Sequence, residues 1–174
     1  MSKASAGLRL DDYLPYRLSV ASECVSQLIA RAYQARFSLR IPEWRLIAVL
    51  ADQSDLTPQD LVARTRMDKV TVSRAARALL RRGLAARAPH AIDRRSHTLS
   101  LTVDGARLFE HVAPVAKSYE AALLQTLTPA DISTLKSLLG RIQARAGELM
   151  DAAADPPDGL APVAALPSRA IVAS

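Results

Sequence analysis

The 174-residue sequence predicts a mainly α-helical fold, and three observations lead to that prediction. Apolar residues recur at spacings of three and four along most of the chain, which is the period of one helix face. Alanine and leucine supply much of the apolar content, whereas aromatic residues, which strands favour, make up only 4%. Two Thr-Pro-x-Asp segments, at residues 57–60 and 128–131, carry the capping threonine, early proline and first-turn acid that begin helices.

The first four predicted elements are helices. Residues 10–36 carry one long apolar stripe, and Pro42 begins a second helix that ends near residue 51. The first Thr-Pro-x-Asp segment begins a short third helix that ends near Arg64. Asp68 is the next cap, and the fourth helix runs from there to residue 81 or 82, where Gly83 ends it. The stripe of the first helix consists of Leu14, Leu18, Ala21, Val25, Leu28, Ile29 and Ala32.

The segment that follows predicts a two-stranded hairpin. Residues 84–88 and 98–101 have strand character, and the second of these alternates polar and apolar residues. The polar residues 89–97 between them suit a hairpin loop. A short helix, a turn, a second helix and a hairpin, in this order, are typical of a winged helix-turn-helix.

The order of these elements divides the chain. The outer helices carry apolar stripes that a small winged domain cannot cover, so we expect them to pack on one another and on a second copy of the chain. The predicted division is a flexible N-terminus at 1–9, a helical dimerisation region at 10–36 and 103–150 (with helices over 103–127 and 129–150), a winged helix-turn-helix domain at 37–102, and a flexible Ala- and Pro-rich tail at 151–174.

The positive charge of the sequence is concentrated in one window. The whole chain carries a net charge of +6, but residues 64–95 contain ten basic residues against Asp68 and Asp93, a net +8. The tail from residue 151 carries −2, and the remaining 12 basic and 12 acidic residues balance. A block of one sign this dense indicates a polyanionic partner.

The fourth helix is the first candidate site within this window. Its apolar residues predict one inward face, formed by Val72, Ala75, Ala76, Leu79 and Leu80. The remaining side chains suit the major groove of DNA, since basic residues donate to guanine, hydroxyls reach phosphates or base edges, and valine meets a thymine methyl group. The alternative is a solvated basic face without a partner. The predicted DNA-binding residues of this helix are Asp68, Lys69, Val70, Thr71, Ser73, Arg74 and Arg77.

The loop of the hairpin is the second candidate. Asp93 lies two residues before Arg95, so its carboxylate can hold the guanidinium extended, and Arg94 lies between them. An arginine held in this way suits insertion into a narrow minor groove. The alternative is an exposed ion pair of little energetic weight.

The sequence also contains the motifs Arg82-Gly83-Leu84, Asp93-x-Arg95 and Leu101-Thr102-x-x-Gly105, in this order. With the order of the elements, they resemble the multiple antibiotic resistance regulator (MarR) family of bacterial homodimeric winged helix-turn-helix transcription factors. The resemblance covers about residues 10–148. It implies that 68–77 is the recognition helix, that Asp93 and Arg95 are the wing-tip pair, that Gly83 ends the recognition helix in a conformation other residues avoid, and that the outer helices form the dimer interface.

A small-molecule site is predicted near the first helix. The segment 13–18 with Trp44 looks like the subgroup of the family that controls aromatic-acid catabolism. Arg17 can pair with a carboxylate, while Tyr13, Tyr16 and Trp44 supply flat walls. A thioester of coenzyme A is a further candidate, because Arg31, Arg36, Arg40 and Arg45 lie near in sequence. The alternative is that Tyr16 and Trp44 belong to the core and Arg17 to the surface.

The sequence argues against several other classes. Cys24 is the single cysteine of the sequence, which excludes an internal disulfide. It is expected to be a buried, unreactive thiol on the apolar side of the first helix. His90, Asp93 and His97 do not predict a metal site, and no cofactor or catalytic motif is found. No membrane span or secretory signal is recognised, so the expected compartment is the cytoplasm.

The predicted function is therefore that of a homodimeric regulator bound to a pseudo-palindromic operator in double-stranded DNA. We expect a repressor that a small aromatic acid or its thioester releases, and no enzyme activity. The alternative is an effector-independent DNA-binding, architectural or adaptor protein.

Overall fold

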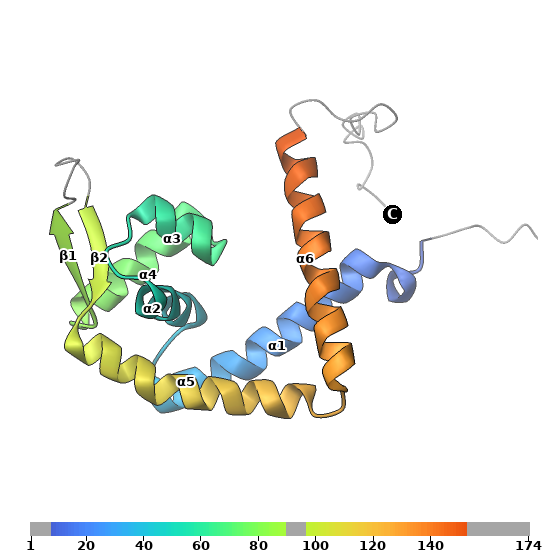
Figure 1. Cartoon of the computed structure of the whole chain (residues 1–174), viewed down its shortest axis with the longest axis horizontal. Helices are drawn as coiled ribbons and strands as arrows, with labels where there is room; N and C mark the ends of the chain where they lie inside the picture. Colours follow the sequence, from blue (N-terminus) through green and yellow to red (C-terminus); the bar gives the residue numbers. More distant parts are fainter. Residues whose placement is uncertain (1–7, 90–96, 153–174) are drawn as a thin grey trace, which may run out of the picture. The chain divides into compact units, whose positions relative to one another are not determined.

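The computed structural model describes residues 8–89 and 97–152 and confirms the mainly helical, winged fold (Figure 1). The chain divides into two compact units, Met1–Ala122 and Leu123–Ser174. The elements are η1 (Leu10–Asp12), α1 (Leu14–Phe37), α2 (Ile41–Asp52), α3 (Pro58–Thr65), α4 (Lys69–Arg81), β1 (Ala85–Pro89), β2 (His97–Leu101), α5 (Val103–Leu124) and α6 (Pro129–Ala152).

The predicted helices and strands lie where the sequence places them, with two differences. The helix predicted to begin at residue 10 is split, because Tyr13 is extended and separates η1 from α1. Pro15 lies in the first turn of α1, where its missing N–H group leaves no hydrogen bond unmade. The helix predicted to reach residue 127 ends at Leu124, shortly before Thr128 and Asp131 form the cap of α6.

The core lies within the first unit and joins the winged domain to α1 and α5. Val72, Ala75, Ala76 and Leu79 of α4 are buried and Leu80 is partly buried, which confirms the predicted inward face. The C-terminal part of α1 and the middle of α5 enter the same core. Its fully buried side chains are Leu39, Leu46, Ile47, Leu61, Leu79, Leu99 and Val112.

The wing is an antiparallel pair of strands extended by one further bridge. Ala85 pairs with Leu101 and Arg87 with Leu99. Leu56, just before α3, exchanges two main-chain hydrogen bonds with Leu99, at 3.0 and 2.8 Å. Burial does not follow the alternation of polar and apolar residues along the second strand, because Thr98 is buried as well as Leu99.

The junction of α4, the wing and α5 explains the glycines of the sequence motifs. Gly83 has φ +67°, and the amide of Leu84 donates to the carbonyl of Leu79, so the left-handed ending of α4 is confirmed. The Thr102 hydroxyl donates to the Gly83 carbonyl at 2.7 Å and accepts from the Gly105 amide at 3.1 Å. A Cβ atom on Gly105 would lie 1.9 Å from the Leu84 carbonyl oxygen, so only glycine permits this approach.

The apolar stripes of the outer helices are largely exposed in the single chain. Of the residues predicted to form the stripe of α1, only Ala32 is buried, while Leu14 and Leu28 are 59% and 44% exposed. α6 has no buried residue at all. Among the described residues, no helix combines the length and the hydropathy that crossing a membrane requires.

Candidate nucleic-acid interface

The N-terminus of α4 is built on Asp68. The Asp68 carboxylate accepts hydrogen bonds from the amides of Val70 and Thr71, both at 2.9 Å, and from the Thr71 hydroxyl at 2.5 Å. The hydrogen bond from the Thr71 hydroxyl, with those from the backbone, holds the pKa of Asp68 below its usual value. Asp68 therefore caps and orients the helix. Asp68 and Thr71, both predicted to bind DNA, are hydrogen-bonded to each other.

The outward face of α4 brings the other predicted residues together. Lys69, Val70, Ser73, Arg74 and Arg77 are all exposed, and Val70 is 57% exposed although it is apolar. The inward face anchors this helix on the core, so the exposed side chains are presented on a rigid element. Spacings of three and four place Val70, Arg74, Arg77 and Arg81 on one stripe.

The wing contributes Arg87, which is exposed on β1. Asp93, Arg94 and Arg95, the residues predicted to reach the minor groove, lie outside the described residues. His90 lies outside them as well. Within the described part of the chain, no group of three or more side chains suits a metal ion.

A groove rich in arginine lies beside α4, and sequence reasoning did not find it. It has a volume of about 790 Å³ between α4 and the junction of α1 with α2. Arg40 lies outside the basic window of the sequence, yet the fold brings it to the same groove as four arginines of that window. The lining residues are Gln34, Ser38, Arg40, Pro42, Glu43, Thr71, Arg74, Ala75, Arg77, Ala78, Arg81 and Arg82.

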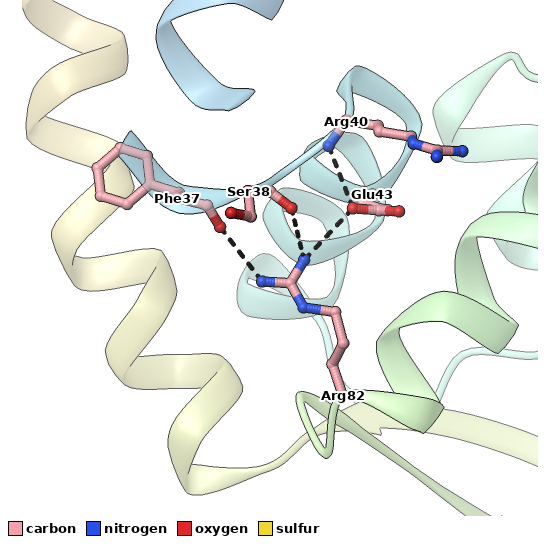
Figure 2. A network of polar contacts seen from close by, with 5 residues as sticks. All are labelled: Phe37, Ser38, Arg40, Glu43 and Arg82. Carbon is pink, nitrogen blue, oxygen red and sulfur yellow. Dashed lines mark hydrogen bonds and ion pairs between the residues drawn. The ribbon is translucent and has the colours of Figure 1, made fainter. Parts of the chain in front are cut away.

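Arg82, at the end of α4, bonds to residues at the junction of α1 with α2 (Figure 2). Its guanidinium donates to the carbonyls of Ser38 at 2.9 Å and Phe37 at 3.2 Å, and it lies 3.5 Å from the Glu43 carboxylate. Glu43 is only 7% exposed, and it also accepts from the Arg40 amide at 3.1 Å. One buried carboxylate thus caps α2 and binds Arg82 at the C-terminal end of α4.

The predicted ligand residues do not form one pocket within a single chain. Tyr13, Tyr16 and Arg17 are exposed near the start of α1. Trp44 is partly buried and packs against Tyr33, with ring centroids 5.4 Å apart, and stacks on Phe109 at 5.8 Å. Tyr33 follows Arg17 by 16 residues, which is about 24 Å along a helix.

The prediction that Cys24 is buried is wrong for the single chain. Its side chain is exposed in the single chain and not buried. The neighbouring Val25 is half-buried, so the boundary of the apolar face runs between the two residues. A helical stripe indicates which residues share a face, but it does not indicate how far the core extends along that face.

Comparisons with known proteins agree with this architecture. Residues 37–96 match the model of the MarR family. The search of curated proteins found no match. Among solved structures, a MarR/EmrR family transcriptional regulator from Acinetobacter sp. ADP1 is 25% identical, with a TM-score of 0.75 over 81% of this chain and 99% of that chain.

Two further structures are similar. A MarR family transcriptional regulator from Silicibacter pomeroyi is 29% identical, with a TM-score of 0.67 over 81% of this chain and 93% of that chain. BpsR of Bordetella bronchiseptica, whose DNA binding is regulated by 6-hydroxynicotinic acid, is 23% identical and shares the fold, with a TM-score of 0.74 over 79% of this chain and 98% of that chain. Residues 37–96 are therefore similar to the MarR family, and the chain has the winged-helix fold of the MarR/EmrR transcriptional regulators.

Proposed function

We propose that this protein is a homodimeric, sequence-specific DNA-binding transcriptional regulator that uses α4 as its recognition helix. The observation that carries the proposal is the outward face of α4, where Val70, Arg74 and Arg77 are exposed on a helix whose other face is locked into the core. A helix is narrow enough to enter the major groove, and these side chains match its donors, acceptors and methyl groups.

The wing is proposed to add minor-groove contacts through Asp93, Arg94 and Arg95. β1 and β2, which lead to this loop, pair from Ala85 with Leu101 up to Pro89 with His97, and Leu56 bridges to Leu99. The strands on either side of the loop are therefore ordered. The proposal for these three residues rests on their sequence, because they lie outside the described residues.

Fluorescence anisotropy with a duplex from the region upstream of the protein's own coding sequence tests the recognition helix. We expect Arg74→Ala to reduce discrimination by about 1–3 kcal/mol at one base position in each half-site. Lys117→Ala is the matched control, because Lys117 is an exposed cation on α5 outside the proposed interface. Equal binding of wild-type protein to the upstream duplex and to a scrambled duplex would contradict sequence-specific recognition and favour an architectural or adaptor role.

Dimer formation is supported by the exposed apolar side chains outside the winged domain. α6 carries Leu138 and Ile142, which are 45% and 41% exposed, and α1 carries Leu14, which is 59% exposed. Apolar helical faces of this extent are normally covered by a partner. A second copy is the partner that also matches the two-fold symmetry of a pseudo-palindromic operator.

A repressor released by a small aromatic acid or its thioester is the proposed regulatory mode. BpsR is an example of this fold whose DNA binding is regulated by an aromatic acid. Because Arg17 and Trp44 lie far apart along one chain, a pocket that uses Tyr13, Tyr16 and Arg17 requires residues from the second copy. Trp44 enters such a pocket only if its contacts with Tyr33 and Phe109 leave one edge accessible.

A thermal-shift screen of phenolic acids and their thioesters, followed by DNA release measured by anisotropy, tests this mode. We expect Arg17→Ala to keep DNA affinity within a few-fold while abolishing release by the acid that acts on the wild type. If the acid still releases DNA from the Arg17→Ala variant at the concentration that acts on the wild type, the acid binds elsewhere. Absence of any stabilising acid would favour effector-independent binding.

A further inference from the structure

The arginine groove beside α4 carries far more positive than negative charge. Five arginines line it, and Glu43 is its only acidic residue. Glu43 is nearly buried, and its carboxylate is paired with Arg82 and accepts from the Arg40 amide, so Arg82 offsets its negative charge. The groove therefore offers a strongly favourable site for an anion.

Three of the five guanidinium groups are available to bind. Arg82 is occupied by two main-chain carbonyls and Glu43, and the Nε of Arg77 donates to the Ser73 carbonyl at 3.3 Å. Arg40, Arg74 and Arg81 have no carboxylate within 4.0 Å among residues 8–89 and 97–152. An arginine without an acidic partner keeps its donors for a phosphate.

The position of these arginines relative to the recognition helix identifies their partner. Arg81 follows Arg74 by two helical turns, about 10 Å, on the same outward stripe. Arg40 lies on the opposite wall of the groove and not on α4. When a helix occupies the major groove, the elements beside it face the phosphate strands at the rim.

We propose that the groove receives the sugar-phosphate backbone of one DNA strand at the edge of the major groove, with Arg40 and Arg81 as phosphate contacts. The proposal rests on the proposed function and extends its footprint beyond the predicted residues. Arg74 lies at the boundary between the base-reading face and the groove. Arg82 and Glu43 hold the two walls together, so the spacing of the phosphate contacts is set by the fold.

DNA is favoured over a small phosphorylated molecule by the continuity of the groove with the face that α4 presents. Arg74 and Arg77 belong both to the groove and to the predicted DNA-binding set. The apolar part of the lining consists of small residues, Pro42, Ala75 and Ala78, which give little surface on which a nucleobase could stack.

The test measures the salt dependence of binding of the full-length protein to its upstream duplex and to a scrambled duplex. Each arginine that contacts one phosphate occurs twice in a dimer, so Arg40→Ala and Arg81→Ala should each make the slope of log K against log salt shallower by about 2. The loss should be the same factor on both duplexes, because phosphates carry no sequence. Lys117→Ala should leave the slope unchanged, and thermal melts of each variant check that it is folded.

The possible failures are distinguishable. If wild-type protein binds neither duplex, the proposed function itself is wrong. If wild-type protein binds but Arg40→Ala and Arg81→Ala keep its slope and affinity, the groove is not a backbone contact. If inorganic pyrophosphate or ATP stabilises the wild type but not Arg40→Ala, while the DNA slope is unchanged, the groove binds a small phosphorylated ligand and the assignment to DNA is overturned.

Discussion

The guanidinium of Arg82 donates to the main-chain carbonyl of Ser38 at 2.9 Å, so the C-terminal end of α4 is bonded directly to the end of α1. The two residues are 44 positions apart in the sequence. If α1 contributes to the dimer, as proposed, this bond connects the dimer interface directly to the end of α4. A change in the position of α1 can then change the spacing of the two recognition helices, which must match about 34 Å of DNA.

The first prediction concerns this contact. Arg82→Ala removes three interactions and leaves Glu43, a nearly buried carboxylate, with the Arg40 amide as its remaining partner. Since Arg82 is itself 36% exposed, we expect the free energy of unfolding to fall by only about 1–2 kcal/mol in denaturant titrations. Arg82→Lys should recover part of this loss, because lysine keeps the charge but lacks the planar fork. Full stability of Arg82→Ala would show that the network is energetically neutral.

The second prediction concerns two glycines that are required for different reasons: Gly105 because there is no space for a side chain, and Gly83 because of its backbone conformation. Gly105→Ala places a Cβ atom against the Leu84 carbonyl, so α5 must move from the wing, and we expect destabilisation of more than about 2 kcal/mol. Gly83→Ala has no atom within 4 Å of its Cβ but keeps φ at +67°, so it should cost only about 1–2 kcal/mol. Thermal and chemical unfolding of both variants measures the difference, and the opposite ranking would refute this assignment of roles.

The third prediction concerns pH. The hydrogen bond from the Thr71 hydroxyl, with those from the backbone, lowers the pKa of Asp68 from 3.8, and Thr128 does the same for Asp131. In each case the folded state favours the ionised form, so this stabilisation is present above the unfolded pKa and is lost as pH falls through the lower folded pKa. Unfolding measured from about pH 6 to about pH 2 should show this loss, and Asp68→Asn should have a flatter profile. An unchanged profile in Asp68→Asn and Thr71→Val would exclude Asp68 as a contributor.

The fourth prediction concerns assembly. Leu138→Glu combined with Ile142→Glu places charge on exposed apolar positions of α6, one turn apart. If this face meets a second copy, sedimentation velocity should show monomers where the wild type is dimeric, and operator affinity should fall together with dimer formation. Gln143→Glu on the same helix adds charge as a control. A wild-type protein that is monomeric at micromolar concentration would contradict the proposed dimer.

Local signals in the sequence were sufficient for most of the elements and for the inward face of α4, but not for the break at Tyr13 or the end of α5 at Leu124. Capping boxes, early prolines and apolar periodicity act over three to eight residues, so the helix starts at Pro58, Lys69 and Pro129 follow from neighbouring side chains. The exposed positions Lys69, Val70, Ser73, Arg74 and Arg77 follow from the same periodicity once the buried face is known. The two motif glycines lie where the structure requires glycine, Gly83 because of its φ of +67° and Gly105 because a Cβ atom would meet the Leu84 carbonyl.

Tertiary structure alone decided what the distant residues do. Arg40 joins the basic surface, and Trp44 packs against Tyr33 and Phe109 and not beside Arg17, because these contacts link elements far apart in the chain. Cys24 is exposed although it lies beside the apolar stripe, because the core covers only the C-terminal end of α1. Periodicity indicates which side of a helix is apolar, because that side is set by residues three and four positions apart. Which surface covers the apolar side depends on contacts between elements far apart in the chain, and no local pattern contains that information.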